Sequence, residues 1–292
     1  MIEESAALLR SGISTVGIIL AAMAVVALIE IAIPLHARGR WHGAHLGPNL
    51  ALTFITFATN IVFNSALVLT LTWQQSTGLG VLHMLELPRL VTVLVVVLVL
   101  DFSFYVAHVS MHRIPALWRF HRVHHSDPAV DVTTTIRQHP GEGVIRYAFM
   151  AAFACALGAS PAAFAVYRSW SALNGLLEHA NVRVPLWLDR VLSLVTTWPN
   201  MHKVHHSRIG TETNTNYGNI FSVFDRLFST FTPSERGANV SYGLDGFDDP
   251  AAQTTAGLLA MPLSADADGA HRARAGARAS TGRAGAGARG AR

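Results

Sequence analysis

Three long apolar runs carry almost no charge, and they limit what this chain can fold into more than any other feature. Ser14–Pro34 contains a single charged residue, Glu30, and Asn49–Trp73 contains none. The third run, Leu90–Leu100, is rich in β-branched residues and continues through Tyr105. A helix needs about 20 predominantly apolar residues to cross a bilayer. The runs therefore predict an integral membrane protein with three spanning helices, the first retained rather than cleaved as a signal peptide.

Composition agrees with a membrane protein and excludes several other classes. Hydrophobic residues make up 51% of the 292 residues and charged residues 14%, whereas soluble domains carry about 25% charged residues. From Ser264 onward six arginines and two aspartates account for the whole net charge of +4, so no nucleic-acid partner is expected. This Ala/Gly/Arg-rich tail has nothing to bury and is predicted to be disordered. The lone Cys155 rules out a disulfide framework and a cysteine-ligated iron–sulfur cluster.

The second half of the chain predicts a helical hairpin and a cap. Glu142–Asn181 is interrupted by Gly158-Ala159-Ser160-Pro161, and proline suits the first position of a helix. We therefore expect two helices that dip into the bilayer and return. Pro185–Trp198, with tryptophans near its ends, predicts an interfacial helix, and Ile220–Phe231 a short helix that caps the domain.

The basic loop after the first run sets an expected orientation. Arg38 and Arg40 lie between the first two apolar runs, and loops rich in arginine stay in the cytoplasm. The N-terminus would then lie outside, and the third helix would run inward and end at the cytoplasmic surface.

Histidines gather at that end of the third run and again about eighty residues later. Asp101–Ser126 contains His108-x3-His112 and His121-x2-His124-His125, and His202-x2-His205-His206 repeats the triplet. Residues three and four apart share a helix face, so each cluster directs its imidazoles one way. Eight histidines exceed the three or four protein ligands of one zinc ion, which favours two metal ions. Imidazole suits zinc, copper, iron and nickel alike. His36, His42 and His45 are interpreted as loop residues that face lipid headgroups.

Four segments together carry a family resemblance: DFSFYVAHVSMH, HRVHHS, HKVHHS and NTNYGNIFSVFDRLFSTF. They cover roughly residues 95–232 and resemble the membrane-bound fatty acid hydroxylase/sterol desaturase superfamily. The resemblance implies an all-α bundle of about four membrane helices with a cytosolic, histidine-rich cap. It also implies a non-haem di-iron oxygenase with two Fe ions and O2 as co-substrate. The expected catalytic and metal-binding residues are His108, His112, His121, His124, His125, His179, His202, His205 and His206.

The resemblance also implies roles for several further residues. Glu178-His179-Ala180-Asn181 resembles an additional histidine motif, which makes His179 the ninth ligand candidate. His139 is a candidate ligand, second-shell group or substrate contact, or else anchors the start of the hairpin. Asp101 is expected to accept an N–H from a ligating imidazole, and Glu178 to do the same or to approach the metal.

Two further parts of the family pattern concern the end of the hairpin and the cap. Asn216, Tyr217 and Asp225 match the family's downstream stretch and are interpreted as turn and packing residues of the cap. Asn174 departs from the pattern of relatives that place a further histidine nearby.

The expected organisation follows from these assignments. Residues 1–48 form an N-terminal membrane helix and basic loop, residues 49–235 the di-iron membrane domain with its cap, and residues 236–292 a C-terminal extension with a disordered tail from about residue 264. We expect a multi-pass protein of a bacterial inner membrane or of the endoplasmic reticulum.

The expected function is O2-dependent hydroxylation, or desaturation, of a C–H bond in a lipid such as a sterol or fatty acyl chain. A hydrophobic cavity beneath the metals, lined by the third helix, would hold the lipid. No redox module is recognisable in the sequence, so electrons would come from an external ferredoxin or cytochrome b5-like protein with its reductase. Two other classes remain open. A membrane zinc hydrolase would need a carboxylate base as in H-E-x-x-H, which is absent. A metal transporter would place ionisable residues at mid-membrane depth, whereas these histidines lie outside the apolar runs.

Overall fold

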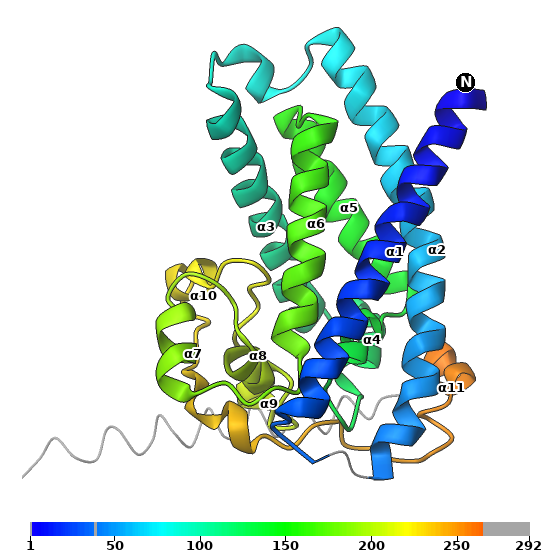
Figure 1. Ribbon diagram of the computed structural model, residues 1–292, viewed down its shortest axis with the longest axis vertical. Coiled ribbons are helices and arrows are strands. Elements are labelled where there is room, and N and C mark those ends of the chain that lie inside the picture. The colour runs from blue at the N-terminus through cyan, green and yellow to red at the C-terminus, as the bar shows by residue number, and fades with distance from the viewer. Residues whose placement is uncertain (1, 38–39, 265–292) are drawn as a thin grey trace, which may run out of the picture.

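The computed structural model describes residues 2–37 and 40–264, and within these ranges the chain is helical and forms no β-strand. Figure 1 shows the long helices standing side by side with a cap of short helices at one end. The long helices are α1 (Ile2–Ala32), α2 (Arg40–Thr77), α3 (Arg89–Arg113), α5 (Pro140–Leu157) and α6 (Pro161–His179). The shorter elements are η1 (Val81–Met84), α4 (Pro115–His125), η2 (Val132–Ile136), α7 (Leu186–Leu192), α8 (Pro199–His205), α9 (Gly210–Thr213), α10 (Val223–Leu227), η3 (Ser234–Asn239), α11 (Thr255–Ala260) and η4 (Met261–Leu263).

Three helices are long and apolar enough to cross a membrane, at Gly12–Ala32, Gly43–Met84 and Arg89–Arg113. They coincide with the three apolar runs and confirm the predicted helical membrane fold. Large apolar side chains on them point outward: Leu28 is 66% exposed and Leu90 70% exposed. A surface of this kind is stable against lipid, where the helical backbone satisfies its own hydrogen bonds.

The predicted hairpin is present as α5 and α6. Gly158 ends α5 with a φ of 66°, and the Ser160 hydroxyl accepts a hydrogen bond from the Ala163 N–H at 3.2 Å to begin α6. The turn reaches the connection between α2 and α3, where a Cβ on Gly80 would lie 2.3 Å from the Cα of Gly158. Both open ends of the hairpin lie at the cap (Figure 1). The hairpin therefore carries residues near His139 and His179 to the same end of the bundle.

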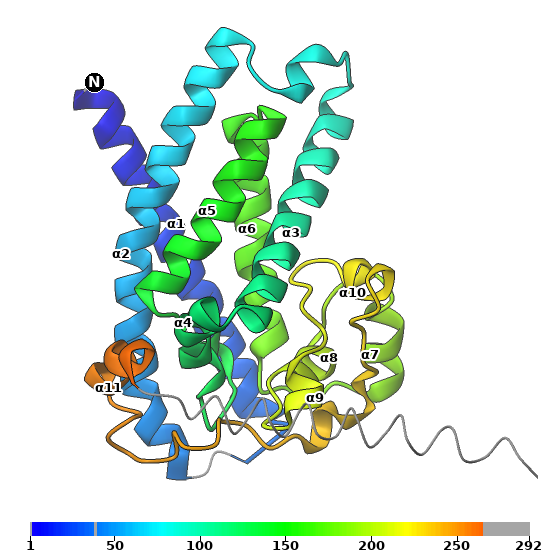
Figure 2. The ribbon, with the colours of Figure 1, turned by 180° about the vertical axis from the view of Figure 1, so that it is seen from behind.

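The cap includes the segment that was expected to form a separate C-terminal extension. Figure 2 shows α11 beside α4 and α2, and one buried apolar cluster joins these parts. Its members are Leu52, Trp118, Val123, Leu244, Phe247, Leu258 and Met261. The fully buried Arg137 donates to the Gln253 side chain at 2.7 Å. The expected boundary after residue 235 thus falls inside a packed unit, while the expected disordered tail lies outside the described residues, apart from Ser264.

Two local expectations need correction. The interfacial helix is shorter than Pro185–Trp198: α7 ends at Leu192, because Thr196 then pairs with Phe221 in an isolated bridge. His45 does not face headgroups but is 1% exposed. Its Nδ1 lies 3.1 Å from an Asp127 oxygen, so a buried carboxylate retains the imidazole inside the cap.

Candidate metal centre

Nine buried histidines from four helices meet where the bundle joins the cap. α3 ends with His108 and His112, and Pro115 starts α4 directly afterwards, which turns the first triplet back toward α3. α6 ends at His179, and Pro199 starts α8, which carries the second triplet. None of the nine side chains is more than 7% exposed. The nine histidines expected to bind metal are therefore in one place.

The nine histidines divide into two groups whose donor atoms each lie within 4.8 Å of one another. The five-histidine group is His108, His112, His121, His125 and His205, and the four-histidine group is His124, His179, His202 and His206. Each triplet contributes to both groups. The i and i+4 residues of a triplet share one group, whereas the i+3 residue, on the other side of the stripe, joins the other group. The expectation that each triplet points all its imidazoles one way is thus too simple.

The spacing of the nitrogen atoms fits a shared ion. In the four-histidine group the Nε2 atom of His179 lies 3.1 Å from those of His124 and His202 and 3.2 Å from that of His206. In the five-histidine group the Nε2 atom of His121 lies 3.0 Å from that of His108 and 3.2 Å from that of His125. Nitrogen atoms about 2.1 Å from one ion, at right angles to each other, would be about 3.0 Å apart.

The imidazoles outside the membrane helices are held in the neutral form that binds metal. Burial and neighbouring imidazoles hold the pKa values of His124, His125 and His206 well below the usual value. Burial also lowers the pKa of His205 to about 4. Near neutral pH each ring therefore carries a proton on one nitrogen atom only, and the other nitrogen keeps the lone pair that binds a metal ion.

Backbone carbonyl groups orient one histidine in each of three helices. The Nδ1 atoms of His108, His179 and His205 lie 2.8 Å from the carbonyl oxygens of Tyr217, Gly175 and Thr215, respectively. A ring that donates through Nδ1 presents the lone pair of Nε2 to the centre. The same contacts fix the direction of the three rings.

Two aspartates hold the cap segment that supplies the Tyr217 carbonyl. Asp225 accepts hydrogen bonds from the N–H groups of Tyr217 and Gly218 at 2.7 and 2.8 Å, as the expected role in the cap requires. Asp101 differs from expectation. It accepts from the N–H groups of Ile220 and Phe221 at 3.1 and 2.9 Å and contacts no imidazole. Its carboxylate is used to join α3 to the cap backbone.

Two glutamates border the groups. Glu178 is 3% exposed, and its Oε1 atom lies 3.8 Å from both His179 Nδ1 and His202 Nε2. Glu142, which the sequence analysis did not single out, lies closer: its Oε1 atom is 3.1 Å from His121 Nδ1. The sequence signal for it was a glutamate one turn before Arg146 at the start of an apolar helix, a position where a charge is costly without a partner.

His139 and Asn174 are not part of either group. His139 begins α5, where its Nδ1 atom accepts a hydrogen bond from the Gly141 N–H at 2.9 Å, so it anchors the start of the hairpin. The Asn174 side chain donates to the Asn219 carbonyl at 2.6 Å. It braces α6 against the cap rather than approaching a histidine.

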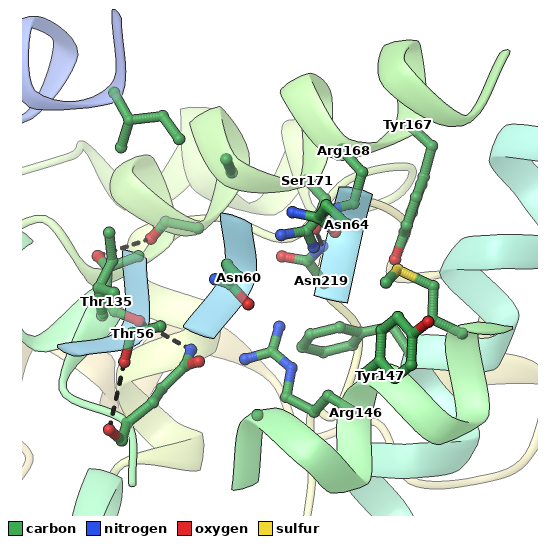
Figure 3. Close-up of a pocket in the computed structure, with 18 of the residues that line it drawn as sticks. Thr56, Asn60, Asn64, Thr135, Arg146, Tyr147, Tyr167, Arg168, Ser171 and Asn219 are labelled. Atoms are coloured by element: carbon green, nitrogen blue, oxygen red, sulfur yellow. Dashed lines mark hydrogen bonds between the residues drawn. The ribbon is translucent and has the colours of Figure 1, made fainter. Parts of the chain in front are cut away.

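A cavity of about 280 Å³ lies below the histidines and reaches both groups. His108 and His121 border it from the five-histidine group, and His124, His179 and His202 from the four-histidine group. The expectation of a hydrophobic cavity lined by aromatic and β-branched residues of α3 is met in part. The aromatic Phe104 of α3 borders it, as do apolar residues of other helices such as Phe57 and Phe164, but none of the described β-branched residues of α3 does. Figure 3 shows polar side chains around it, among them Asn60, Asn64, Arg146, Arg168 and Asn219. The described residues of α3 that border it before His108 are Ser103, Phe104 and Ala107.

Comparisons with known proteins agree with the resemblance. Residues 93–230 match the fatty acid hydroxylase family model. The chain is 32% identical to an ornithine lipid hydroxylase of Rhizobium tropici over 177 residues, which are 61% of this chain and 52% of that protein. It is 30% identical to an alkylglycerol monooxygenase of Caenorhabditis elegans over 148 residues, 49% of this chain and 28% of that protein. The corresponding protein of Danio rerio is 31% identical over 164 residues, 56% and 35% of the two chains.

The matched region is the part of the chain that carries the histidines. The chain spans at most about half the length of these relatives, and no solved structure matches it significantly. The family match begins in α3 and ends just after α10, so it includes both triplets, the hairpin and the aspartate-held segment of the cap. Residues 93–230 therefore form a fatty acid hydroxylase domain, and the relatives agree with the resemblance to the fatty acid hydroxylase/sterol desaturase superfamily.

Proposed function

We propose that the protein is a membrane-bound non-haem di-iron oxygenase that hydroxylates, or desaturates, a C–H bond of a lipid. The observation that carries this proposal is the division of nine buried histidines into two adjoining groups, both open to one cavity. One iron ion would be held by the five-histidine group and the other by the four-histidine group. The names of the relatives, which are hydroxylases and monooxygenases of lipids, support the reaction class.

When bound, a pair of iron ions would contribute the reduction of O2 and an oxidant able to remove hydrogen from an unactivated C–H bond. The chain's own residues do the rest. The carbonyl groups of Tyr217, Gly175 and Thr215 fix ring directions, and the nine histidines are buried, none more than 7% exposed. A lipid carbon in the cavity would lie beside histidines of both groups.

The histidine end of the bundle is proposed to face the cytoplasm. Leu35, which precedes the basic segment of the sequence, lies at this end, since its N–H donates to the Asn181 carbonyl at 3.1 Å. The positive charge of this segment favours the cytoplasmic side. An external electron donor, a ferredoxin or a cytochrome b5-like protein with its reductase, would dock on the cap and provide two electrons per turnover.

The orientation can be tested with single cysteines in a Cys155→Ser background. Ser76, at the opposite end of the bundle, and the exposed Asp249 are suitable positions. A membrane-impermeant maleimide should label Ser76→Cys in intact cells and Asp249→Cys only after lysis. The reverse pattern would exclude a cytoplasmic centre.

The metal should be measured first. Protein purified anaerobically in mild detergent after iron-supplemented growth should contain about two irons per chain and give the Mössbauer spectrum of a coupled pair. Iron-loaded protein should then form an O2-dependent lipid product when given a reductant. One zinc per chain, with no binding of iron on reconstitution, would overturn the proposal in favour of a hydrolase. If two zincs copurify, activity after exchange for iron decides the question.

A further inference from the structure

Two arginines from the hairpin border the cavity below the histidines, although both belong to helices packed inside the bundle. Arg146 lies on α5 and Arg168 on α6. Figure 3 shows both side chains reaching into the cavity, with Asn60 and Asn64 of α2 nearby. Charged and strongly polar residues at membrane depth are costly and are retained where they serve a function.

The polar residues follow the faces of three helices that border this one cavity. On α2 they are Thr56, Asn60 and Asn64, four residues apart; on α5 they are Glu142 and Arg146, also four apart. On α6, Arg168 and Ser171 lie on the same stripe as Glu178 and His179, which come about two turns after Ser171. Each stripe thus leads from the interior of the bundle toward the histidines. Arg146 is the nearer arginine, since Glu142 lies between it and His121, whereas Arg168 lies eleven residues, about 16 Å along α6, before His179.

The charged residues near the histidines, Arg146 and Glu178, have charged or titratable partners, whereas Arg168, deeper in the bundle, has no carboxylate beside it among the described side chains. Arg146 Nη1 lies 3.7 Å from Glu142 Oε1, and its guanidinium stacks over the Phe104 ring at 4.4 Å. Glu178 lies against His179 and His202. Among the residues that the structure describes, no carboxylate lies within ion-pair distance of Arg168, and its Nε atom has no hydrogen-bond partner. The cavity therefore has an unbalanced positive charge at Arg168, on the side away from the histidines.

From this arrangement we infer that the cavity binds the oxyanion of an acidic lipid, through Arg168 with Arg146, in the same cavity that the histidines border. A guanidinium binds carboxylate and phosphate with two parallel hydrogen bonds, and the amide groups of Asn60 and Asn64 can donate further ones. The inference rests on the proposed function and specifies its substrate class: an acidic lipid rather than a sterol or a hydrocarbon.

Binding can be measured without turnover. The full chain in detergent is mixed with equal amounts of three lipids that share a palmitoyl chain: lysophosphatidic acid, N-palmitoylglycine and 1-palmitoylglycerol. Native mass spectrometry then reports which lipid stays bound. We expect at least one of the two acids to exceed the neutral lipid by about tenfold, as one charged hydrogen-bonded contact predicts. The acidic lipid that is retained more shows whether the preferred anion is phosphate or carboxylate.

Variants assign the preference to the arginines. Arg168→Gln and Arg146→Gln should each bring acidic and neutral lipids close to equal retention, and Arg168→Lys should keep part of the preference. Arg190→Gln is the matched control, because Arg190 is a surface residue with a side chain 57% exposed. Only variants with the wild-type metal content are compared. If Arg168→Gln does not purify, Arg168→Lys and Arg146→Gln provide the test.

The outcomes separate this inference from the proposed function. Equal retention of all three lipids by the wild type, or an unchanged preference in both arginine variants, overturns the inference even if an O2-dependent product forms. An arginine-dependent preference supports it even if iron-loaded protein forms no such product, a result that would instead remove the proposed function.

Discussion

His108 and Tyr217 lie 109 residues apart in the sequence, yet the imidazole Nδ1 atom is 2.8 Å from the Tyr217 carbonyl oxygen. The contact joins the end of a membrane helix to a turn of the cap. Asp225 holds that turn from one side through the N–H groups of Tyr217 and Gly218, and Asp101 holds the following residues from the other. The direction of a proposed metal ligand thus depends on two carboxylates that do not touch it.

Replacement of Asp225 by asparagine should weaken metal binding without removing a histidine. One carboxylate oxygen becomes an amide donor, which cannot accept the second of the two N–H groups. Partners of this kind affect metal affinity by about 10- to 100-fold, and we expect a loss in that range for iron. The measurement is iron retained during titration with a chelator. Asp248→Asn, which changes an exposed carboxylate paired with Arg208, is the control. Equal retention by both variants would show that the turn does not orient His108.

Neighbouring histidines of one triplet should control different ions. His121 belongs to the five-histidine group and His124 to the four-histidine group. We expect His121→Ala and His124→Ala each to reduce the iron content toward one per chain and to abolish the coupled Mössbauer signal. His139→Gln should keep two irons, because His139 caps α5 and belongs to neither group. Full iron content in both alanine variants would contradict the division into two groups.

The sequence predicted which histidines meet but not how they divide. Spacing of three and four residues places imidazoles on one side of a helix, and this is a local property of α4 and α8. The division into groups depends on how α3, α4, α6 and α8 cross, which no local pattern specifies. Glu142 and His45 show the same limit: each is buried because a partner far away in the sequence, His121 or Asp127, lies opposite.

The cavity also depends on contacts between segments that are distant in the sequence. Asn60 and Asn64 lie in the second apolar run and Arg146 and Arg168 in the predicted hairpin, but their common direction depends on the packing of α2, α5 and α6. The three spans and the hairpin could be predicted because hydropathy and the Gly-Ala-Ser-Pro break are read within one segment. The inclusion of residues 240–264 in the cap could not, since their contacts are with α2 and α4.

Iron-free protein should lose stability as the pH falls below 6.5. Burial lowers the pKa of His205 to about 4, and the pKa values of His124, His125 and His206 are lowered as well. Below pH 6.5 the unfolded chain therefore binds protons that the folded chain does not, which favours unfolding. For His205 the loss continues down to about pH 4. We expect the Tm of the iron-free protein in detergent to fall between pH 7 and pH 5. A Tm that rises or stays constant over this interval would show that the rings are not held neutral by the fold.

Gln253 should stabilise the cap although it lies beyond the boundary expected from the sequence. Its side-chain oxygen accepts a hydrogen bond from Arg137 at 2.7 Å, and its nitrogen donates to the carbonyl oxygens of Phe247 and Ser126 at 2.8 and 3.1 Å. Substitution by alanine leaves one of the donors of the fully buried Arg137 without this partner.

An unsatisfied buried group costs about 1–3 kcal/mol, so Gln253→Ala should lower the Tm measurably. Gln75→Ala, at an exposed position of α2, should leave it unchanged. Because Arg137 also donates to the Val123 carbonyl and the Ser126 hydroxyl at 2.9 Å, next to His124 and His125, the variant should retain iron less well than the control. If Gln253→Ala matched Gln75→Ala in both Tm and iron retention, residues 240–264 would be a covering segment that contributes nothing to the centre.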